Sequence, residues 1–238
     1  MRRVPLLPLL ASALLAATAV YAESDLPTSQ EPTGTQVALR SPQVPVSGTA
    51  LATFFASQGQ AITPTSDQLD LQQLSVSANS SFEVRAFGSE LTASAGAYNS
   101  VAPSPALYQI WPSSMLPGWY PVCSFRSGPT RLVVNLFDNT NALQGTTTYI
   151  GADPSAFGFY GQGASGTVYQ QDFRNAFGAA RILAYAGLGT RSGYTWLAIE
   201  TTSTTNGDYA DLILLVNFGL VPVEVERASW GELKQRFR

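Results

Sequence analysis

The sequence predicts a mainly β protein, an antiparallel β-sandwich with one short N-terminal helix and a short C-terminal helical tail. In several short segments apolar and polar residues alternate with a period of two, as in strands buried on one face. Glycine, asparagine and proline separate these segments at short intervals. Charged residues make up only 12% of the chain, and Ser, Thr, Asn, Gln and Gly supply the polarity, which suits an extracellular sandwich.

The first 22 residues predict a signal peptide. Arg2 and Arg3 precede an apolar run over residues 6–20, and the small residue Ala22 marks the expected cleavage site. No later apolar run reaches the length of about 18 residues that a membrane-spanning helix needs. The pattern therefore predicts a secreted or cell-surface protein without a transmembrane segment after cleavage.

The segment after the signal peptide changes character near residue 47. Residues 23–46 are rich in Pro, Thr, Ser and Gln, which predicts a disordered linker. Leu51, Phe54 and Phe55 then follow at the spacing i, i+3 and i+4, which places them on one face of a helix. We expect one short helix here, packed on a sheet.

The sandwich domain is predicted at residues 47–219. Its expected strands are residues 82–86, 132–136, 146–150, 157–160, 167–171, 181–185, 194–200 and 211–218. Turn-forming residues at 138–141 make 131–150 a hairpin, and a glycine-rich turn joins the next two strands. The strand at 211–218 is apolar on both faces, so we expect it to be central in its sheet.

Residues 220–238 form a predicted C-terminal amphipathic tail. Trp230, Leu233 and Phe237 share one helical face, and basic residues lie between and beyond them. The tail resembles the short Trp-Gly-x-x-Lys-x-x-Phe/Tyr-Arg endings of some exported bacterial proteins, which implies a sorting or docking element. The alternatives are a terminal helix packed on the domain and a helix resting on an anionic surface.

The composition excludes several classes of chemistry. The chain has no histidine, which removes Ser-His-Asp and Cys-His catalysis, imidazole zinc sites and histidine bases. Its single cysteine, Cys123, has no partner for an internal disulfide and is expected to be a buried apolar residue in a strand. The net charge of −3 argues against nucleic acid as a partner.

Oxygen-bearing residues gather between the last two predicted strands. We predict a calcium site there, formed by Glu200, Asn206, Asp208 and Asp211. In a regular strand Asp208 and Asp211 would point to opposite faces, so a shared cation requires a bend before Ala210. The alternative is a plain turn, because Asn206 and the glycine after it are strong hairpin-forming residues.

Residues 119–218 resemble a family of exported bacterial domains of unknown function, which is marked by an acidic, aromatic motif before its last strand. The motif is carried here by Ile199-Glu200 and Asp208-Tyr209-Ala210-Asp211-Leu212-Ile213, and residues 133–138, 145–149 and 157–160 resemble family strands. The resemblance implies a surface or secreted β-sandwich, suspected of binding calcium and without an established reaction. Thr201, Asn206 and Ala210 stand where the family is often acidic, which implies weaker calcium binding.

Three functions follow from these features. The first is a non-catalytic structural or adhesive domain, stabilised by calcium, whose partner is an extracellular protein or glycan. The second is a carbohydrate-binding module with exposed aromatic residues, and the third is a hydrolase that uses carboxylates. The aromatic candidates are Trp111, Trp119, Tyr120 and Trp196. The carboxylate candidates are Glu83, Glu90, Asp172 and Glu200. A further oxygen-rich turn contains Asp138, Asn139 and Asn141.

Overall fold

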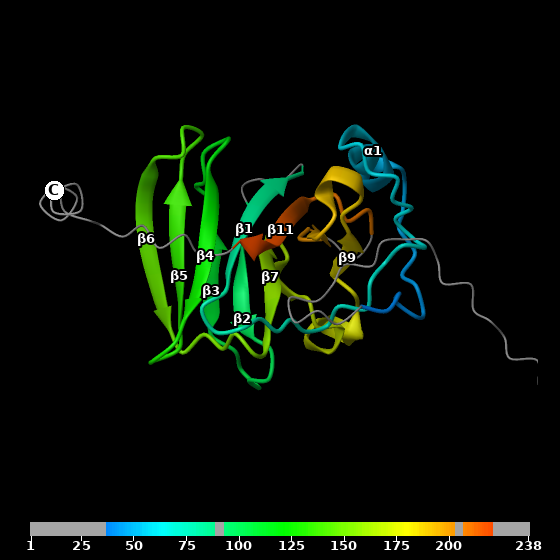
Figure 1. Cartoon of the computed structure of the whole chain (residues 1–238). Helices are drawn as coiled ribbons and strands as arrows, with labels where there is room; N and C mark the ends of the chain where they lie inside the picture. Colours follow the sequence, from blue (N-terminus) through cyan, green and yellow to red (C-terminus); the bar gives the residue numbers. More distant parts are fainter. Residues whose placement is uncertain (1–36, 89–92, 203–206, 221–238) are drawn as a thin grey trace, which may run out of the picture.

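The computed structural model describes residues 37–88, 93–202 and 207–220 (Figure 1). The strands are β1 (Ser81–Phe87), β2 (Ser94–Asn99), β3 (Leu107–Trp111), β4 (Tyr120–Arg126), β5 (Arg131–Phe137), β6 (Leu143–Ile150), β7 (Phe157–Gly163), β8 (Gly166–Tyr169), β9 (Ile182–Ala186), β10 (Tyr194–Ile199) and β11 (Leu212–Leu220). The helices are α1 (Ala50–Ser57) and the short 3-10 helices η1 (Asp172–Arg174), η2 (Ala176–Gly178) and η3 (Gly189–Arg191).

These strands form two antiparallel sheets that pack face to face. The larger sheet has seven strands in the order β6-β5-β4-β1-β11-β10-β9, and the smaller has four in the order β3-β2-β7-β8. Both predicted hairpins are present, because β5 pairs with β6 and β7 pairs with β8. The predicted mainly β, sandwich-like fold is therefore confirmed.

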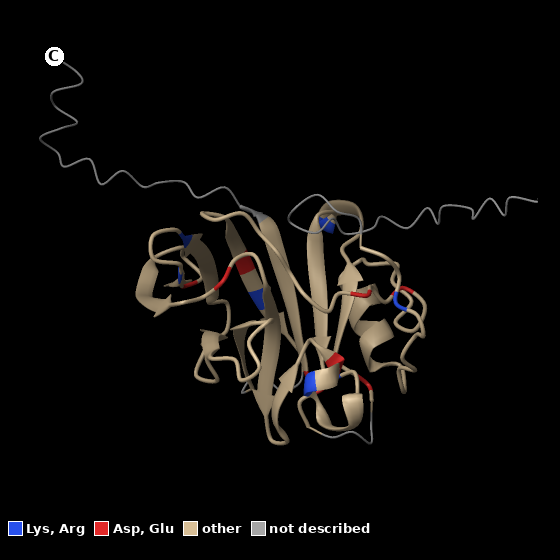
Figure 2. Cartoon of the chain, turned by 90° about the horizontal axis from the view of Figure 1, so that it is seen from below, with Lys and Arg blue, Asp and Glu red and all other residues tan. Residues whose placement is uncertain are grey.

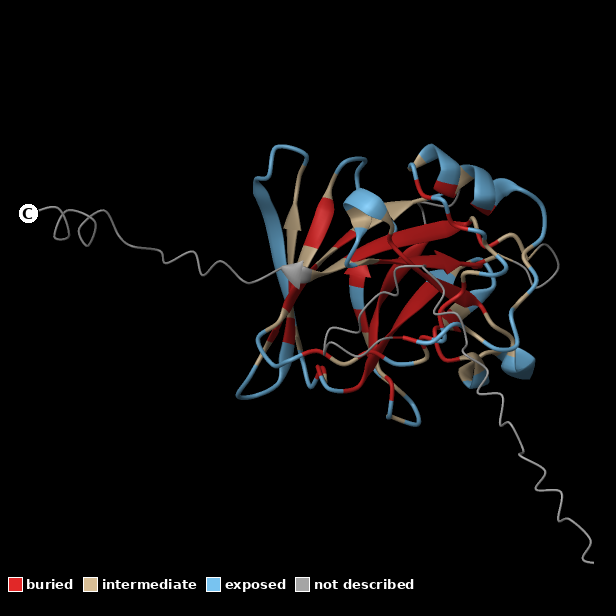
Figure 3. Ribbon diagram, turned by 45° about the vertical axis from the view of Figure 1, so that its right-hand side comes forward, coloured by how far each residue is buried: buried red, intermediate tan, exposed pale blue. Residues whose placement is uncertain are grey.

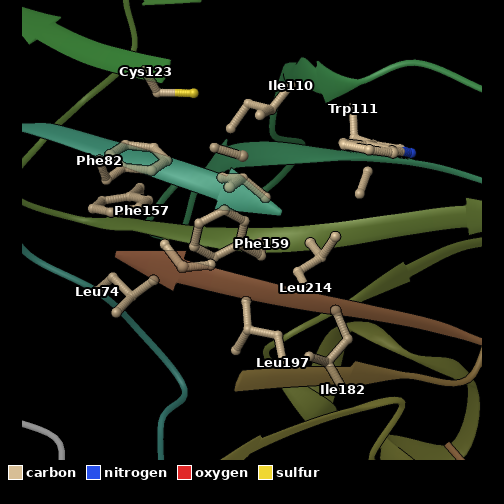
Figure 4. Packing of buried hydrophobic residues seen from close by; sticks show 14 of the residues in the cluster. Leu74, Phe82, Ile110, Trp111, Cys123, Phe157, Phe159, Ile182, Leu197 and Leu214 are labelled. Atoms are coloured by element: carbon tan, nitrogen blue, oxygen red, sulfur yellow. The ribbon is translucent and has the colours of Figure 1, made fainter. Parts of the chain in front are cut away.

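Phenylalanine rings fill the space between the two sheets (Figure 4). The rings belong to Phe82, Phe125, Phe157, Phe159 and Phe218, whose contacting centroids lie 5.1–6.5 Å apart. Cys123 on β4 is fully buried in the same core, and burial raises the pKa of its thiol well above the ordinary value. As predicted, this cysteine behaves as a small buried apolar residue.

Strand β11 is covered on both faces, as its sequence predicted. Leu212, Leu214 and Val216 face the core between the sheets. Ile213 and Leu215 face the opposite side, where α1 packs on the outer face of the larger sheet. β11 is hydrogen-bonded to β1 on one side and to β10 on the other, so it is an interior strand.

Helix α1 docks on this outer face through the residues that predicted it. Phe54 and Phe55 place their ring centroids 5.5 and 5.9 Å from the ring of Trp196 on β10. Phe55 also lies 5.0 Å from Tyr185 on β9. A second apolar core therefore lies beneath α1, over the β9, β10 and β11 half of the sheet (Figure 1).

The domain begins earlier than predicted, because residues 37–46 pack against it. Leu39 forms a β-bridge with Leu69. The side chain of Gln68 accepts a hydrogen bond from the N–H of Val44 at 2.8 Å and donates one to its carbonyl at 2.6 Å. The prolines that indicated a linker are compatible with this extended segment, whose backbone is satisfied by Gln68. At the other end β11 runs to Leu220. The predicted signal peptide, residues 23–36 and the tail after Leu220 lie outside the described residues.

The opposite edge of the larger sheet extends beyond its covering layers. β6 pairs with β5, and nearly every residue of β6 is exposed (Figure 3). The few charged residues are scattered singly or in small groups along the described chain, and most residues are uncharged (Figure 2).

Candidate functional site

Three charged residues form a row at one end of β9, β10 and β11. Ile199, the last residue of β10, lies opposite the first residue of β9 and also opposite the first residue of β11. The next positions along the three chains are Arg181, Glu200 and Asp211. The N–H of Glu200 donates to the carbonyl of Arg181 at 2.9 Å, which continues the ladder by one residue. Ladder register therefore brings Glu200 and Asp211 together.

Asp211 secures the chain that leaves β10. Its Oδ2 accepts hydrogen bonds from the N–H groups of Thr201 at 2.8 Å and Thr202 at 3.0 Å, and from the Thr202 hydroxyl at 2.9 Å. Burial alone would raise the pKa of Asp211, but hydrogen bonds from Glu200, Thr202 and the two N–H groups outweigh it and lower that pKa. The same Thr202 hydroxyl lies 3.0 Å from Oε1 of Glu200, so Thr202 bridges the two carboxyl groups.

The bend that a shared cation would require is present at Tyr209. This residue has a φ of 54°, in the left-handed region. Asp208 turns back on its own chain, because its Oδ1 accepts from the N–H of Ala210 at 3.1 Å. Asn206 lies outside the described residues. Within the described ranges no group of three or more His, Cys, Asp or Glu residues is placed to hold a metal ion. Calcium binding stays a prediction.

A cavity of about 620 Å³ lies beside this row, and we call it the polar pocket. Its walls include residues 40–45 and the chain around η2, and its polar lining includes Arg181, Glu200 and Tyr209. The Tyr209 hydroxyl donates to the carbonyl of Ala180 at 2.8 Å, which fixes one wall. Segments far apart in the sequence therefore meet here.

Two further charged groups of the polar pocket form an ion pair. The guanidinium of Arg40 binds Oδ2 of Asp172. Burial raises the pKa of Asp172 even though Arg40 acts in the opposite direction. The other oxygen of Asp172, Oδ1, is buried without a hydrogen-bond partner in the described structure.

Arg181 is the most deeply buried cation of the polar pocket. Its side chain is only 5% exposed, and its hydrogen bond through Nη2 to the Ser165 hydroxyl is long, at 3.5 Å. Its Nε is buried without a hydrogen-bond partner in the described part of the chain. Sequence inspection missed Arg181 and Arg40, because no local motif surrounds either residue.

A second cavity, of about 730 Å³, has aromatic walls, and we call it the aromatic pocket. It lies between the loop at residues 112–119 and the outer face of the larger sheet. Its lining includes Trp111, Trp119, Tyr194 and the ion pair of Glu83 with Arg85. The indole Nε1 of Trp111 is buried without a hydrogen-bond partner in the described residues.

The predicted aromatic platform is partly wrong. Trp196 is fully buried beneath α1, and Tyr120 and Trp111 are also buried, so none of these three rings presents an exposed face. The guanidinium of Arg85 instead stacks on the ring of Tyr120, with its carbon 3.5 Å from the ring centroid. Trp111 and the half-buried Trp119 are brought together, but as walls of a pocket instead of a flat surface.

The carboxylates suggested for hydrolysis lie in separate interactions. Glu83 is bound to Arg85 and Asp172 to Arg40, and Glu200 accepts a hydrogen bond from the Thr202 hydroxyl. Glu90 lies outside the described residues. The turn with Asp138, Asn139 and Asn141 is held by hydrogen bonds between residues of the turn itself. Oδ1 of Asp138 accepts from the N–H groups of Thr140 at 2.8 Å and Ala142 at 3.0 Å, as in an ordinary turn.

No protein-family model matches this chain, and no curated protein matches it by sequence. The resemblance to the exported family therefore rests on its motif and strands alone. None of the helices among the described residues combines the length and apolar character that crossing a membrane would demand.

Proposed function

We propose that this protein is a non-catalytic, secreted or cell-surface binding domain with an adhesive role, which holds a glycan in its aromatic pocket. The observation that carries this proposal is the presence of two half-buried rings, Trp119 and Tyr194, in one cavity with charged side chains. The signal-like N-terminus and the composition, poor in charge and rich in Ser, Thr, Asn and Gln, support the location outside the cytoplasm.

The lining of the aromatic pocket matches the two kinds of surface on a sugar. The C–H face of a pyranose ring packs on an aromatic ring, and Trp119 and Tyr194 offer such rings. Sugar hydroxyl groups need fixed donors and acceptors, which the ion pair of Glu83 and Arg85 supplies. The indole N–H of Trp111, which has no described partner, is a further donor within the same wall.

Replacing Trp119 by Ala is expected to weaken glycan binding at least about tenfold, because truncation removes a stacking surface from the pocket wall. A glycan array would identify the sugar, and calorimetry would compare the Kd of the two proteins. The matched control is Phe173→Ala, which removes a ring that is 71% exposed and lines neither pocket. Equal affinity of Trp119→Ala and the unmodified protein for every sugar on the array would refute the proposal.

The sequence predicts calcium at Glu200, Asn206, Asp208 and Asp211, but the hydrogen bonds that Asp208 and Asp211 already accept favour the alternative of a plain turn. We expect EDTA, followed by excess calcium, to leave the Tm unchanged, because Oδ2 of Asp211 and Oδ1 of Asp208 already accept hydrogen bonds from the protein. Differential scanning calorimetry would measure the Tm under both conditions. A saturable rise in Tm with calcium that Asp208→Asn abolishes would contradict this expectation and establish the metal site.

A further inference from the structure

Arg181 is a buried cation that forms no ion pair in the described structure. The two ion pairs among the described residues are Arg40 with Asp172 and Arg85 with Glu83. The carboxyl group beside Arg181 on the next strand, that of Glu200, forms no ion pair with it in the described part of the chain and accepts a hydrogen bond from the Thr202 hydroxyl at 3.0 Å. The loop at residues 203–206 reads Ser-Thr-Thr-Asn and so contains no carboxylate. Burying an arginine without a counterion is costly, which makes its position in a cavity informative.

The same cavity contains a second buried polar atom without a partner. Oδ1 of Asp172 is a hydrogen-bond acceptor that has no donor among the described residues. Nε of Arg181 is a hydrogen-bond donor that has no acceptor among them. Both residues line the polar pocket. Folded proteins pair nearly all of their buried polar atoms, so two unpaired atoms in the lining of one cavity indicate a ligand that completes them.

We propose that the polar pocket binds a small ligand carrying a carboxylate, which Arg181 neutralises, and a hydroxyl or ammonium group, which donates to Asp172. A planar carboxylate suits Arg181, because a guanidinium offers parallel N–H donors that a carboxylate accepts in pairs. The cavity volume of about 620 Å³ accommodates a molecule the size of a sugar acid. This site is separate from the aromatic pocket and does not depend on its proposed function.

The test compares the Tm of the full chain with glucuronate, acetate, glucose and sulfate at constant ionic strength. Glucuronate, at ten times its Kd, should raise the Tm by roughly 3–6 °C, and glucose should not. Acetate should act more weakly than glucuronate, because it lacks the group that donates to Asp172. A response to sulfate but to neither carboxylate would overturn the proposed ligand class, and no saturable response to glucuronate or acetate would overturn the site.

The variant Arg181→Met separates a binding role from a structural one. Methionine keeps the apolar stem but removes the buried charge, so the Tm of the free protein should stay equal or rise while the response to glucuronate is lost. The matched control is Arg126→Met on β4, an arginine that lines neither pocket and should leave the response intact. A lowered Tm of the free Arg181→Met protein together with an unchanged glucuronate response would show that Arg181 is structural and would refute the proposal. Trp119→Ala should respond to glucuronate as the unmodified protein does, so failure here leaves the glycan proposal standing.

Discussion

Replacing Trp196 by Ala is expected to lower the free energy of unfolding by about 3–5 kcal/mol, one of the two largest effects in this protein. The ring is fully buried on the outer face of the larger sheet. It lies within 6 Å, centroid to centroid, of Phe54, Phe55 and Phe87. Truncation therefore removes the surface on which α1 rests, and a loss of this size is a large share of the stability of a typical domain. Urea unfolding measured by circular dichroism would provide the value.

Two further variants make this result specific to Trp196. Trp196→Phe keeps a ring in the cluster and removes an indole N–H that has no hydrogen-bond partner in the described structure, so it should cost much less than Trp196→Ala. Phe173→Ala removes an exposed ring and should change stability by less than about 0.5 kcal/mol. Comparable losses for Trp196→Ala and Phe173→Ala would show that α1 does not depend on this contact.

Replacing Gly96 by Ala is expected to destabilise the protein by about 3 kcal/mol or more, because there is no space for a methyl group at this position. A Cβ on Gly96 would lie 2.1 Å from the backbone oxygen of Tyr108 and 2.7 Å from the ring of Tyr160. The first contact is with a backbone atom of β3, so relief requires the pairing of β2 and β3 to open. Chemical denaturation would measure the loss, and hydrogen exchange would locate it in these strands.

Gly145→Ala is the matched control for Gly96→Ala. Gly145 also lies within a strand, the exposed β6, but a Cβ there would meet no atom within 4 Å. The free energy of unfolding of the Gly145→Ala protein should therefore change by less than about 1 kcal/mol. We expect a small increase, because alanine restricts the conformations of the unfolded chain. Similar losses for both glycines would mean that glycine content in general, and not the close approach at Gly96, determines the effect.

The sequence predicted β1 and β5 to β11 and did not predict β2, β3 and β4. β2 reads Ser-Ala-Gly-Ala-Tyr-Asn, with little hydrophobic contrast between its faces. Its small residues are needed because Tyr108 and Tyr160 approach its backbone closely, which only the tertiary structure reveals. β4 contains Pro121 and Cys123, which interrupt a recognisable alternation.

The candidate sites were predictable only where their residues are close in sequence. Glu200 and Asp211 flank the connection between two paired strands, so ladder register brings them together, and the bend at Tyr209 was anticipated as a requirement. Arg40 and Asp172 come from segments more than a hundred residues apart, and their ion pair follows from the docking of the N-terminal segment. Likewise, local pattern identified Trp111 and Trp119 as aromatic candidates but not the pocket that they share.

The packing of residues 37–46 affects where a shortened version of this protein should begin. A recombinant form starting at Ser47, the boundary that composition suggests, would lack the partner of Asp172 and the backbone groups that satisfy Gln68. It would also lack one wall of the polar pocket. Such a truncation would remove Val37 from the core and uncover the apolar residues that it packs against, and would yield a less stable and less soluble sample for crystallisation or screening. Starting at or before Val37 avoids this damage.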